Sequence, residues 1–359
     1  MVSTARSRRP SRRLRLLAPV LAVGVVAAGV TLPRLADASG GASSLEPRTA
    51  AELLAQVSTA EVDGLSGTVV ATSRLGLPEL PSGRSGGSAV TLTDLLSGST
   101  TARVWQAGED RSRVAVDAPF AEYDVVRDDR DVWTYDSASS DVTHLVLPEE
   151  QADAAPSPAP GTATPQDVAE QLLSFVEPTT TVTVGSAEQV AGRPAYELVL
   201  EPKDPQTLVD TVRIAVDGET SVPLRVQVFG VDQTEPAAEV AFTAVTFAVP
   251  DASVFAFVPP SGSTVTKRSL ETGKGAPDAA PAPEGAMTMP TVLGSGWSSV
   301  VQLTGVELPE ESAGLLGQLA EPVEGGQVVS SAVLSVLLLD DGRVLAGSVS
   351  PERLVELSR

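Results

Sequence analysis

Six short segments of β-strand character follow one another between residues 67 and 147, and they limit the possible folds more than any other feature. Clusters of turn-forming residues separate them. Such a succession indicates an antiparallel sheet, since short turns can join neighbouring antiparallel strands. Further strands are expected at 211–217 and 224–229, where apolar side chains occupy every second position. The six segments are 67–73, 101–106, 113–117, 123–127, 131–136 and 143–147.

Two amphipathic helices are expected beside these strands. In "PRTAAELLAQVSTAEV", Thr49 and Glu52 have the spacing of a capping box, and an apolar stripe follows them. In "TPQDVAEQLLSFV", Thr164 is a favourable N-cap, Pro165 suits the first helical position, and Asp167 completes a similar capping box. Each helix therefore has one apolar face that it can pack on a larger core.

Stretches rich in Pro, Ala and Gly divide the chain. The stretch 149–163 is expected to be a flexible insertion, and 269–286 has the composition of a linker between domains. The expected organisation is an export segment at 1–38, a main domain at 48–268 that contains the insertion, and a small α/β unit at 287–359.

The C-terminal unit has its own pattern of elements. A strand is expected in "GWSSVVQL", a helix in "EESAGLLGQLA", and a hairpin that turns at Asp340-Asp341-Gly342. Ser350 is placed to cap a last helix, with Pro351 at its first position.

The N-terminus has the features of an export signal. Six arginines lie between residues 6 and 15, and an apolar run from 16 to 32 follows them. Ala36-Asp37-Ala38 fits the small-x-small pattern of a cleavage site. The segment is either a cleaved signal peptide or an uncleaved membrane anchor, since the apolar run is near the shortest length that spans a bilayer. Both alternatives place the rest of the chain outside the cytoplasm, in the cell envelope.

Composition excludes several classes of function. Without residues 1–38 the chain has 18 basic and 45 acidic side chains, a net charge of about −27, so it would repel nucleic acid. It contains no cysteine, which excludes disulfides, thiolate metal sites and a cysteine nucleophile. No metal, nucleotide or redox cofactor is expected. The absence of asparagine and the presence of only three lysines suggest a GC-rich, actinobacterial genome.

One motif matches an enzyme signature. Gly83-Arg84-Ser85-Gly86-Gly87 satisfies the G-x-S-x-G pattern of hydrolases, and His144 is the only histidine available for a triad. That pattern needs a buried strand before the serine and a helix after it, whereas loop residues lie on both sides here. We therefore interpret the motif as a glycine-rich loop and His144 as a residue of a strand, and we expect no catalytic residues.

The few aromatic residues could belong to a binding surface. Trp133 and Tyr135 are two positions apart, so they lie on the same face of one strand. Phe120, Tyr123 and several other phenylalanines fall in or beside other strands. These side chains either form an ordinary sheet core or line an apolar cavity that could bury acyl chains.

Several stretches, in order, resemble the LolA-type lipoprotein carriers and the RseB/MucB-type periplasmic regulators. They are "GLSGTVVATSRL" after the first helix, "RDDRDVWTYDSASSDVTHLVLP", "TPQDVAEQLLSFV", "GRPAYELVLEPKD" and the closing "VFAFVPPSGSTV", and they span about residues 48–266. The carriers have an Arg-Pro pair after an early strand that contains a tryptophan. Here "QAGEDRS" follows Trp105, so that arginine has no counterpart. The unit at 287–359 resembles the regulators in architecture only.

The resemblance implies an α+β fold, in which an open antiparallel half-barrel curls around helices and encloses an apolar cavity for acyl chains. The small C-terminal unit follows it. Trp133, Tyr135 and His144 would belong to a scaffold hairpin. The residues expected to bind acyl chains are Trp105, Phe120, Tyr123, Trp133, Tyr135, Leu172, Phe175, Phe229, Phe242 and Phe247.

Three hypotheses of function follow. The first is an exported, non-enzymatic protein that binds lipid acyl chains or lipoproteins. The second is an envelope-stress sensor that regulates a membrane protein, such as an anti-sigma factor, by direct contact. The third, a hydrolase that uses Ser85 and His144, has the weakest support in the sequence.

Overall fold

A computed structural model of the protein describes residues 25–26, 45–76, 97–118, 121–148, 162–173, 179–269, 291–304 and 319–359. Several predicted features lie outside these residues: most of the export segment, of the insertion and of the linker, the G-x-S-x-G motif, and most of the helix in "EESAGLLGQLA". Within the described stretches, no helix is long and apolar enough to cross a membrane.

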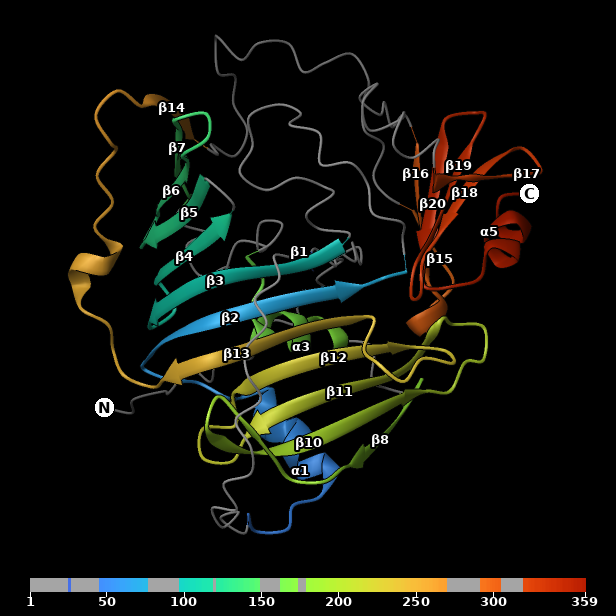
Figure 1. Ribbon diagram of the computed structural model, residues 1–359, viewed down its shortest axis with the longest axis horizontal. Helices are drawn as coiled ribbons and strands as arrows, with labels where there is room; N and C mark the ends of the chain where they lie inside the picture. Colours follow the sequence, from blue (N-terminus) through green and yellow to red (C-terminus); the bar gives the residue numbers. More distant parts are fainter. Residues whose placement is uncertain are drawn as a thin grey trace, which may run out of the picture.

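Fourteen of the described strands form one main sheet (Figure 1). They are β1 (Val25–Val26), β2 (Gly64–Arg74), β3 (Ser97–Ala107), β4 (Arg111–Ala118), β5 (Ala121–Asp128), β6 (Asp131–Asp136), β7 (Asp141–Val146), β8 (Thr180–Val184), β9 (Glu188–Val190), β10 (Arg193–Pro202), β11 (Val209–Asp217), β12 (Pro223–Gly230), β13 (Ala238–Thr246) and β14 (Thr264–Ser269). All six strand segments predicted between residues 67 and 147 are present, with somewhat different ends.

The main sheet is open. Its strands run in the order β14-β7-β6-β5-β4-β3-β2-β13-β12-β11-β10-β8, while β9 pairs with β10 and β1 with β3. The end strands β14 and β8 are not paired with each other in this order, and the sheet curls without closing (Figure 1). The predicted open, mainly antiparallel sheet is therefore confirmed.

Two helices pack on one face of this sheet. They are α1 (Ala50–Val57), which lies against β8, and α3 (Pro165–Leu173), which lies against β12 and β13. Both predicted capping boxes are formed. The Glu52 backbone N–H donates to Thr49 Oγ1 at 3.3 Å, and the Asp167 backbone N–H donates to Thr164 Oγ1 at 3.2 Å. The apolar faces of both helices join one core with β10, β11 and β12.

Strand register shows which side chains share the face covered by these helices. Val226 on β12 belongs to the helix-covered core and is paired with Val240 on β13. Val240 is paired with Ala71 on β2, and Ala71 with Thr100 on β3. Because paired residues of antiparallel strands point to the same face, this register can be followed to β7. We call this face the helix side.

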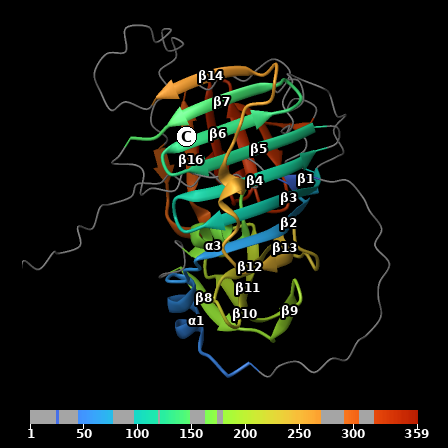
Figure 2. The same cartoon turned by 90° about the vertical axis from the view of Figure 1, so that its left-hand side faces the viewer.

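The opposite face is crossed by a segment that connects β13 with β14. Residues 251–258, which we call the strap, include the short helix η2 (Ala252–Phe255), and η2 packs against β4 and β5. Figure 2 shows the strap in front of these strands. We call this face the strap side. The strap returns the chain across the sheet before β14 begins, so β14 pairs with β7 in parallel, which the antiparallel prediction did not include.

Six further strands form a second, smaller sheet in the order β15-β16-β20-β19-β18-β17. The predicted hairpin turns at residues 340–342, and Ser350 caps the last helix as predicted. The segment "GWSSVVQL" differs from the prediction of a strand throughout, because its first residues form a short 3-10 helix before the strand. The elements are η3 (Gly296–Ser298), β15 (Thr291–Leu293), β16 (Val300–Thr304), β17 (Glu321–Val323), β18 (Gly326–Ser330), β19 (Ser335–Leu339), β20 (Arg343–Gly347) and α5 (Pro351–Leu357).

The second sheet is fixed to the main sheet by buried contacts. The Trp297 side chain lies in the same core as Leu200, and its Nε1 donates to Thr180 Oγ1 at 2.7 Å. The Leu208 backbone N–H donates to the Ser348 carbonyl oxygen at 2.7 Å. The two sheets therefore share part of one hydrophobic core, although the sequence composition predicts a linker before the second one.

A buried carboxylate fixes the turn between β11 and β12. Asp217 is fully buried and accepts hydrogen bonds from the Arg193 guanidinium, at 2.5 and 2.9 Å, and from the Thr220 backbone N–H at 2.8 Å. Burial by itself raises the pKa of Asp217, but the hydrogen bonds from Arg193, Thr220 and Glu219 together hold that pKa below its usual value.

The Asp217→Asn substitution should therefore destabilise the protein in a pH-dependent way. We expect a loss of about 2 kcal/mol at pH 7, because charge-assisted hydrogen bonds are replaced by weaker ones. Since the pKa of Asp217 is lowered by folding, its contribution is complete above the pKa of the unfolded chain and disappears as the pH falls through the folded value. Urea unfolding at pH 7 and pH 3 measures this. An equal difference between the two proteins at both pH values would contradict it.

Candidate functional site

The ten residues predicted to bind acyl chains do not form one cluster. Phe120 and Phe175 lie outside the described residues. Trp105, Trp133, Tyr135 and Phe229 lie on the strap side of the sheet. Tyr123, Leu172 and Phe242 lie on the helix side. Phe247 follows β13, and the Arg193 guanidinium lies over its ring at 4.8 Å. The predicted set is therefore divided between two faces.

The strap covers the aromatic residues of β6 and β7. Trp133 and Tyr135 share a face, as predicted, and Phe257 of the strap packs on both rings, with centroid distances of 5.5 and 6.3 Å. The His144 ring is stacked on Trp133 at 3.8 Å, and its Nε2 lies 2.5 Å from Asp131 Oδ1. These contacts place Trp133, Tyr135 and His144 in a hairpin covered by the chain itself.

Arginine side chains fasten the strap to the sheet. Arg113 forms a two-bond ion pair with the buried Asp124, with a shortest distance of 2.7 Å, and also donates to the Val254 carbonyl oxygen at 3.4 Å. Its guanidinium lies 5.7 Å from the centre of the Trp105 ring. Phe255 is only 1% exposed, so η2 acts as a plug on the strap side.

Phe257→Ala should loosen the strap without unfolding the protein. We expect a loss of about 1 to 2 kcal/mol, because two aromatic contacts disappear. The intrinsic tryptophan emission should also change, since Trp133 would become more exposed to water. Val258→Ala is the matched control, because that neighbouring side chain is 80% exposed. Equal thermal stability and equal emission of the two variants would show that the strap does not depend on Phe257.

The helix side continues beyond the helices over β4 to β7. Register brings together Val116 and Tyr123, Val114 and Val125, and Val132 and Leu145 across this region. We call these six residues the open face. Val116 and Val132 are buried, whereas Tyr123, Val125 and Leu145 are partly exposed. None of the six carries a charge, although the buried Arg127 lies on the same face as the cross-strand partner of Val132. This is the region of the main sheet that best fits a site for an apolar ligand.

Most of the open face was absent from the predicted site. Only Tyr123 belongs to both sets, because the predicted site consists mainly of aromatic residues and the open face mainly of valines. The alternation in "RVAVDA" and "EYDVVRD" does indicate which residues share a face. Val114 and Val116 share one face of their strand, as do Tyr123 and Val125 of theirs. The alternation cannot show which of the two faces the strap covers, because the strap comes from a distant part of the sequence.

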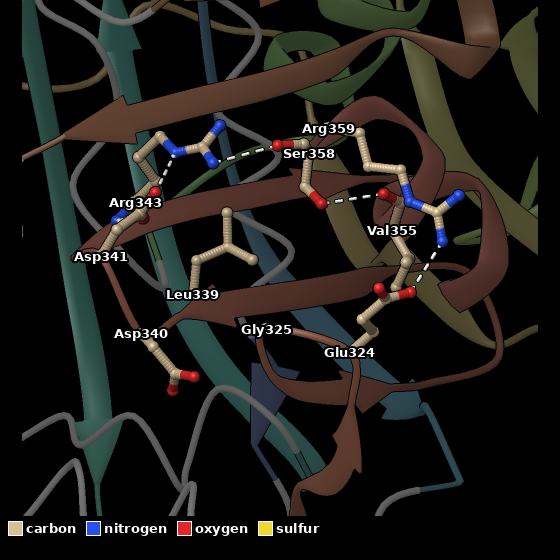
Figure 3. A pocket seen from close by; sticks show the side chains of 9 residues that line it. All are labelled: Glu324, Gly325, Leu339, Asp340, Asp341, Arg343, Val355, Ser358 and Arg359. Carbon is tan, nitrogen blue, oxygen red and sulfur yellow. Dashed lines mark hydrogen bonds and ion pairs between the residues drawn. The ribbon is translucent and has the colours of Figure 1, made fainter.

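A hollow of about 350 Å³ lies in the second sheet, beside α5 (Figure 3). Arg343 at this site is bonded to Asp341 at 2.7 Å and to the Ser358 carbonyl oxygen at 3.0 Å, and Arg359 pairs with Glu324 at 2.8 Å. Both guanidinium groups thus have partners within the chain. The hollow is a surface feature bordered by these ion pairs.

The hydrolase hypothesis gains no geometric support. Ser85 lies outside the described residues, and His144 is engaged with Asp131 and Trp133. Among the described residues, no group of three or more His, Asp and Glu side chains could hold a metal ion.

No protein-family model matches the chain, and no curated protein matches it. Among solved structures, the chain is similar to the MucA/MucB complex of Pseudomonas aeruginosa, with 18% identity over 86% of this chain and 96% of that chain, at a TM-score of 0.44. It is also similar to the LolA superfamily protein NE2245 from Nitrosomonas europaea, with 13% identity over 59% of this chain and 99% of that chain, at a TM-score of 0.25. LprF from Mycobacterium bovis has 11% identity over 56% of this chain and 96% of that chain, at a TM-score of 0.31.

Proposed function

We propose that the protein is an exported, non-enzymatic binding protein that holds the acyl chains of a lipid or lipoprotein on its open face. The observation that carries the proposal is the group of six uncharged, mainly aliphatic and partly exposed side chains over β4 to β7, on the side of the sheet that α1 and α3 cover elsewhere. Such a surface costs free energy in water unless an apolar ligand covers it.

The chemistry of the open face suits an alkyl chain. Each CH₂ group transferred from water to an apolar site contributes about 0.8 kcal/mol, so several valine and leucine side chains in register can hold a long chain. Val114, Val125 and Leu145 are aliphatic and present no hydrogen-bonding group from their side chains. The selectivity would then depend on the polar groups at the border of the face.

The proposed location follows from the N-terminal sequence. The basic residues before the apolar run 16–32 are typical of export, and cleavage near Ala38 would release the chain into the envelope. If the segment is not cleaved, it anchors the protein to the membrane. In both cases the open face would meet lipids or lipoproteins outside the cytoplasm.

A fluorescent acyl probe tests the proposal. A neutral acyl ester that carries a dansyl group should bind the purified protein saturably, with a blue-shifted emission, and unlabelled acyl lipids should displace it. The same titration of the urea-unfolded chain is the control for nonspecific adsorption. A signal that never saturates, or that is the same for the unfolded chain, would argue against a defined acyl site.

The second candidate is an envelope-stress sensor that contacts a membrane protein such as an anti-sigma factor. The fixed attachment of the second sheet, through Trp297 and Ser348, favours it, because a ligand bound to the main sheet could alter a surface held rigidly beside it. A sensor should bind its protein partner with an affinity that changes when acyl lipid is added. A simple carrier should show no such linkage.

A further inference from the structure

Hydroxyl groups extend from one end of the open face to its middle. Tyr123 on β5, Thr134 on β6 and Thr143 on β7 all lie on the helix side, and Thr134 is the direct cross-strand partner of Thr143. The Thr134 side chain is close enough to the Tyr123 phenol to lower its pKa through a hydrogen bond between them. Two hydroxyls have two donor hydrogens, and their mutual bond uses one of them. The pair can therefore donate one further hydrogen bond to a ligand.

Carboxylates border this pair. Asp136 is the cross-strand partner of Tyr123 on one side and of Asp141 on the other. Burial, followed by the nearby charge of Asp136, raises the pKa of Tyr123. The phenol therefore remains a neutral donor at physiological pH. The two carboxylates also make this end of the face unfavourable for a second negative charge.

This arrangement should bind different classes of acyl lipid with different affinities, depending on the polar group next to the acyl chain. An ester carbonyl is a neutral acceptor and can take the hydrogen bond without meeting repulsion. A fatty-acid carboxylate or a phosphate would be placed beside Asp136 and Asp141. An ether lipid has the same alkyl chains but lacks the carbonyl oxygen.

We infer that Tyr123 and Thr134 form a polar anchor for the carbonyl oxygen of a neutral acyl ester, such as an acylglycerol, and that Asp136 and Asp141 disfavour anionic lipids. The inference rests on the proposed function, since the acyl chains must lie on the open face for their carbonyl to reach the anchor. Tyr123 and Thr134 act here as specificity-determining residues.

The test compares 1,2-dioctanoylglycerol with its dioctyl ether analogue by isothermal titration calorimetry. The ester should bind the wild-type protein about 3- to 10-fold more tightly than the ether. This ratio corresponds to the usual contribution of one neutral hydrogen bond to binding. The Tyr123→Phe/Thr134→Val double variant should bind the two ligands with equal affinity. Thermal unfolding of the variant, compared with that of the wild type, confirms that it is folded, and Tyr123→Phe alone serves if the double variant is not.

A second comparison tests the selection against charge. The Asp136→Asn variant should bind octanoate about 5-fold more tightly than the wild type, because a repulsion of about 1 kcal/mol between neighbouring charges is removed. Its affinity for dioctanoylglycerol should change much less than its affinity for octanoate. An unchanged affinity for octanoate would overturn the assigned role of Asp136.

The outcomes separate the inference from the proposed function. If neither the ester nor the ether binds the wild-type protein, the proposed acyl site itself is wrong. If both bind with equal affinity, the acyl site stands and the anchor is wrong. If the double variant keeps the preference for the ester, the carbonyl is held elsewhere on the protein.

Discussion

Val125→Asp should abolish acyl-chain binding. Val125 lies in the middle of the open face, where it is paired with Val114 on β4 and Thr134 on β6, and it is partly exposed. A carboxylate at this position must either lose its hydration when a chain binds or keep the chain away. A desolvation cost of even about 3 kcal/mol corresponds to a loss of affinity of about 100-fold.

Val265→Asp is the matched control for this experiment. Val265 is also a valine in a strand, and its side chain is 42% exposed. It lies on the strap side, as the partner of Val142 on β7. The two variants carry the same change of charge and volume, and only the first should lose the bound probe. Equal binding by folded Val125→Asp and wild-type proteins would show that acyl chains do not lie on the open face.

Trp297→Ala should cause the largest loss of stability among the substitutions considered. The Trp297 side chain is 8% exposed and belongs to the core shared by the two sheets. Its removal leaves a cavity and breaks the hydrogen bond to Thr180, so we expect a loss of about 3 to 5 kcal/mol. Because this core also contains the residues that α1 and α3 cover, the whole protein should unfold at a lower urea concentration.

Two further variants define the origin of that effect. Trp297→Phe keeps most of the apolar volume and loses the hydrogen bond, so it should cost less than the alanine variant. Val292→Ala changes a residue of the same sheet that is 42% exposed, and its stability should be close to that of the wild type. If Trp297→Ala unfolded the second sheet alone and left the main transition unchanged, the two sheets would not share a core.

The strands and helix ends could be predicted because their causes are local. Alternating residues such as Val212, Ile214 and Val216 determine a strand with one core face, and Thr49 with Glu52 determines the start of a helix. The turn at residues 340–342 has the same local origin. Each of these features depends on residues within a few positions of one another, so the sequence pattern was sufficient.

The candidate site could be predicted only in part, because it depends on contacts between distant segments. Trp133 and Tyr135 were correctly placed on one face of β6, but Phe257, more than a hundred residues later, determines that this face is covered. Both faces of β5 to β7 contain apolar residues, so alternation alone could not identify the open one. The linker composition before residue 287 similarly gave no sign that Trp297 would be buried against β8 and β10.

The most direct test of an acyl-binding role is native mass spectrometry of the protein purified from bacterial envelopes without detergent. The proposed function predicts a discrete added mass that corresponds to an acyl lipid, present in the wild-type and Val265→Asp proteins and absent from Val125→Asp, and the inferred anchor predicts that this lipid is a neutral ester. A single mass equal to that of the polypeptide, with no adduct after incubation with dioctanoylglycerol, would contradict an acyl-binding function.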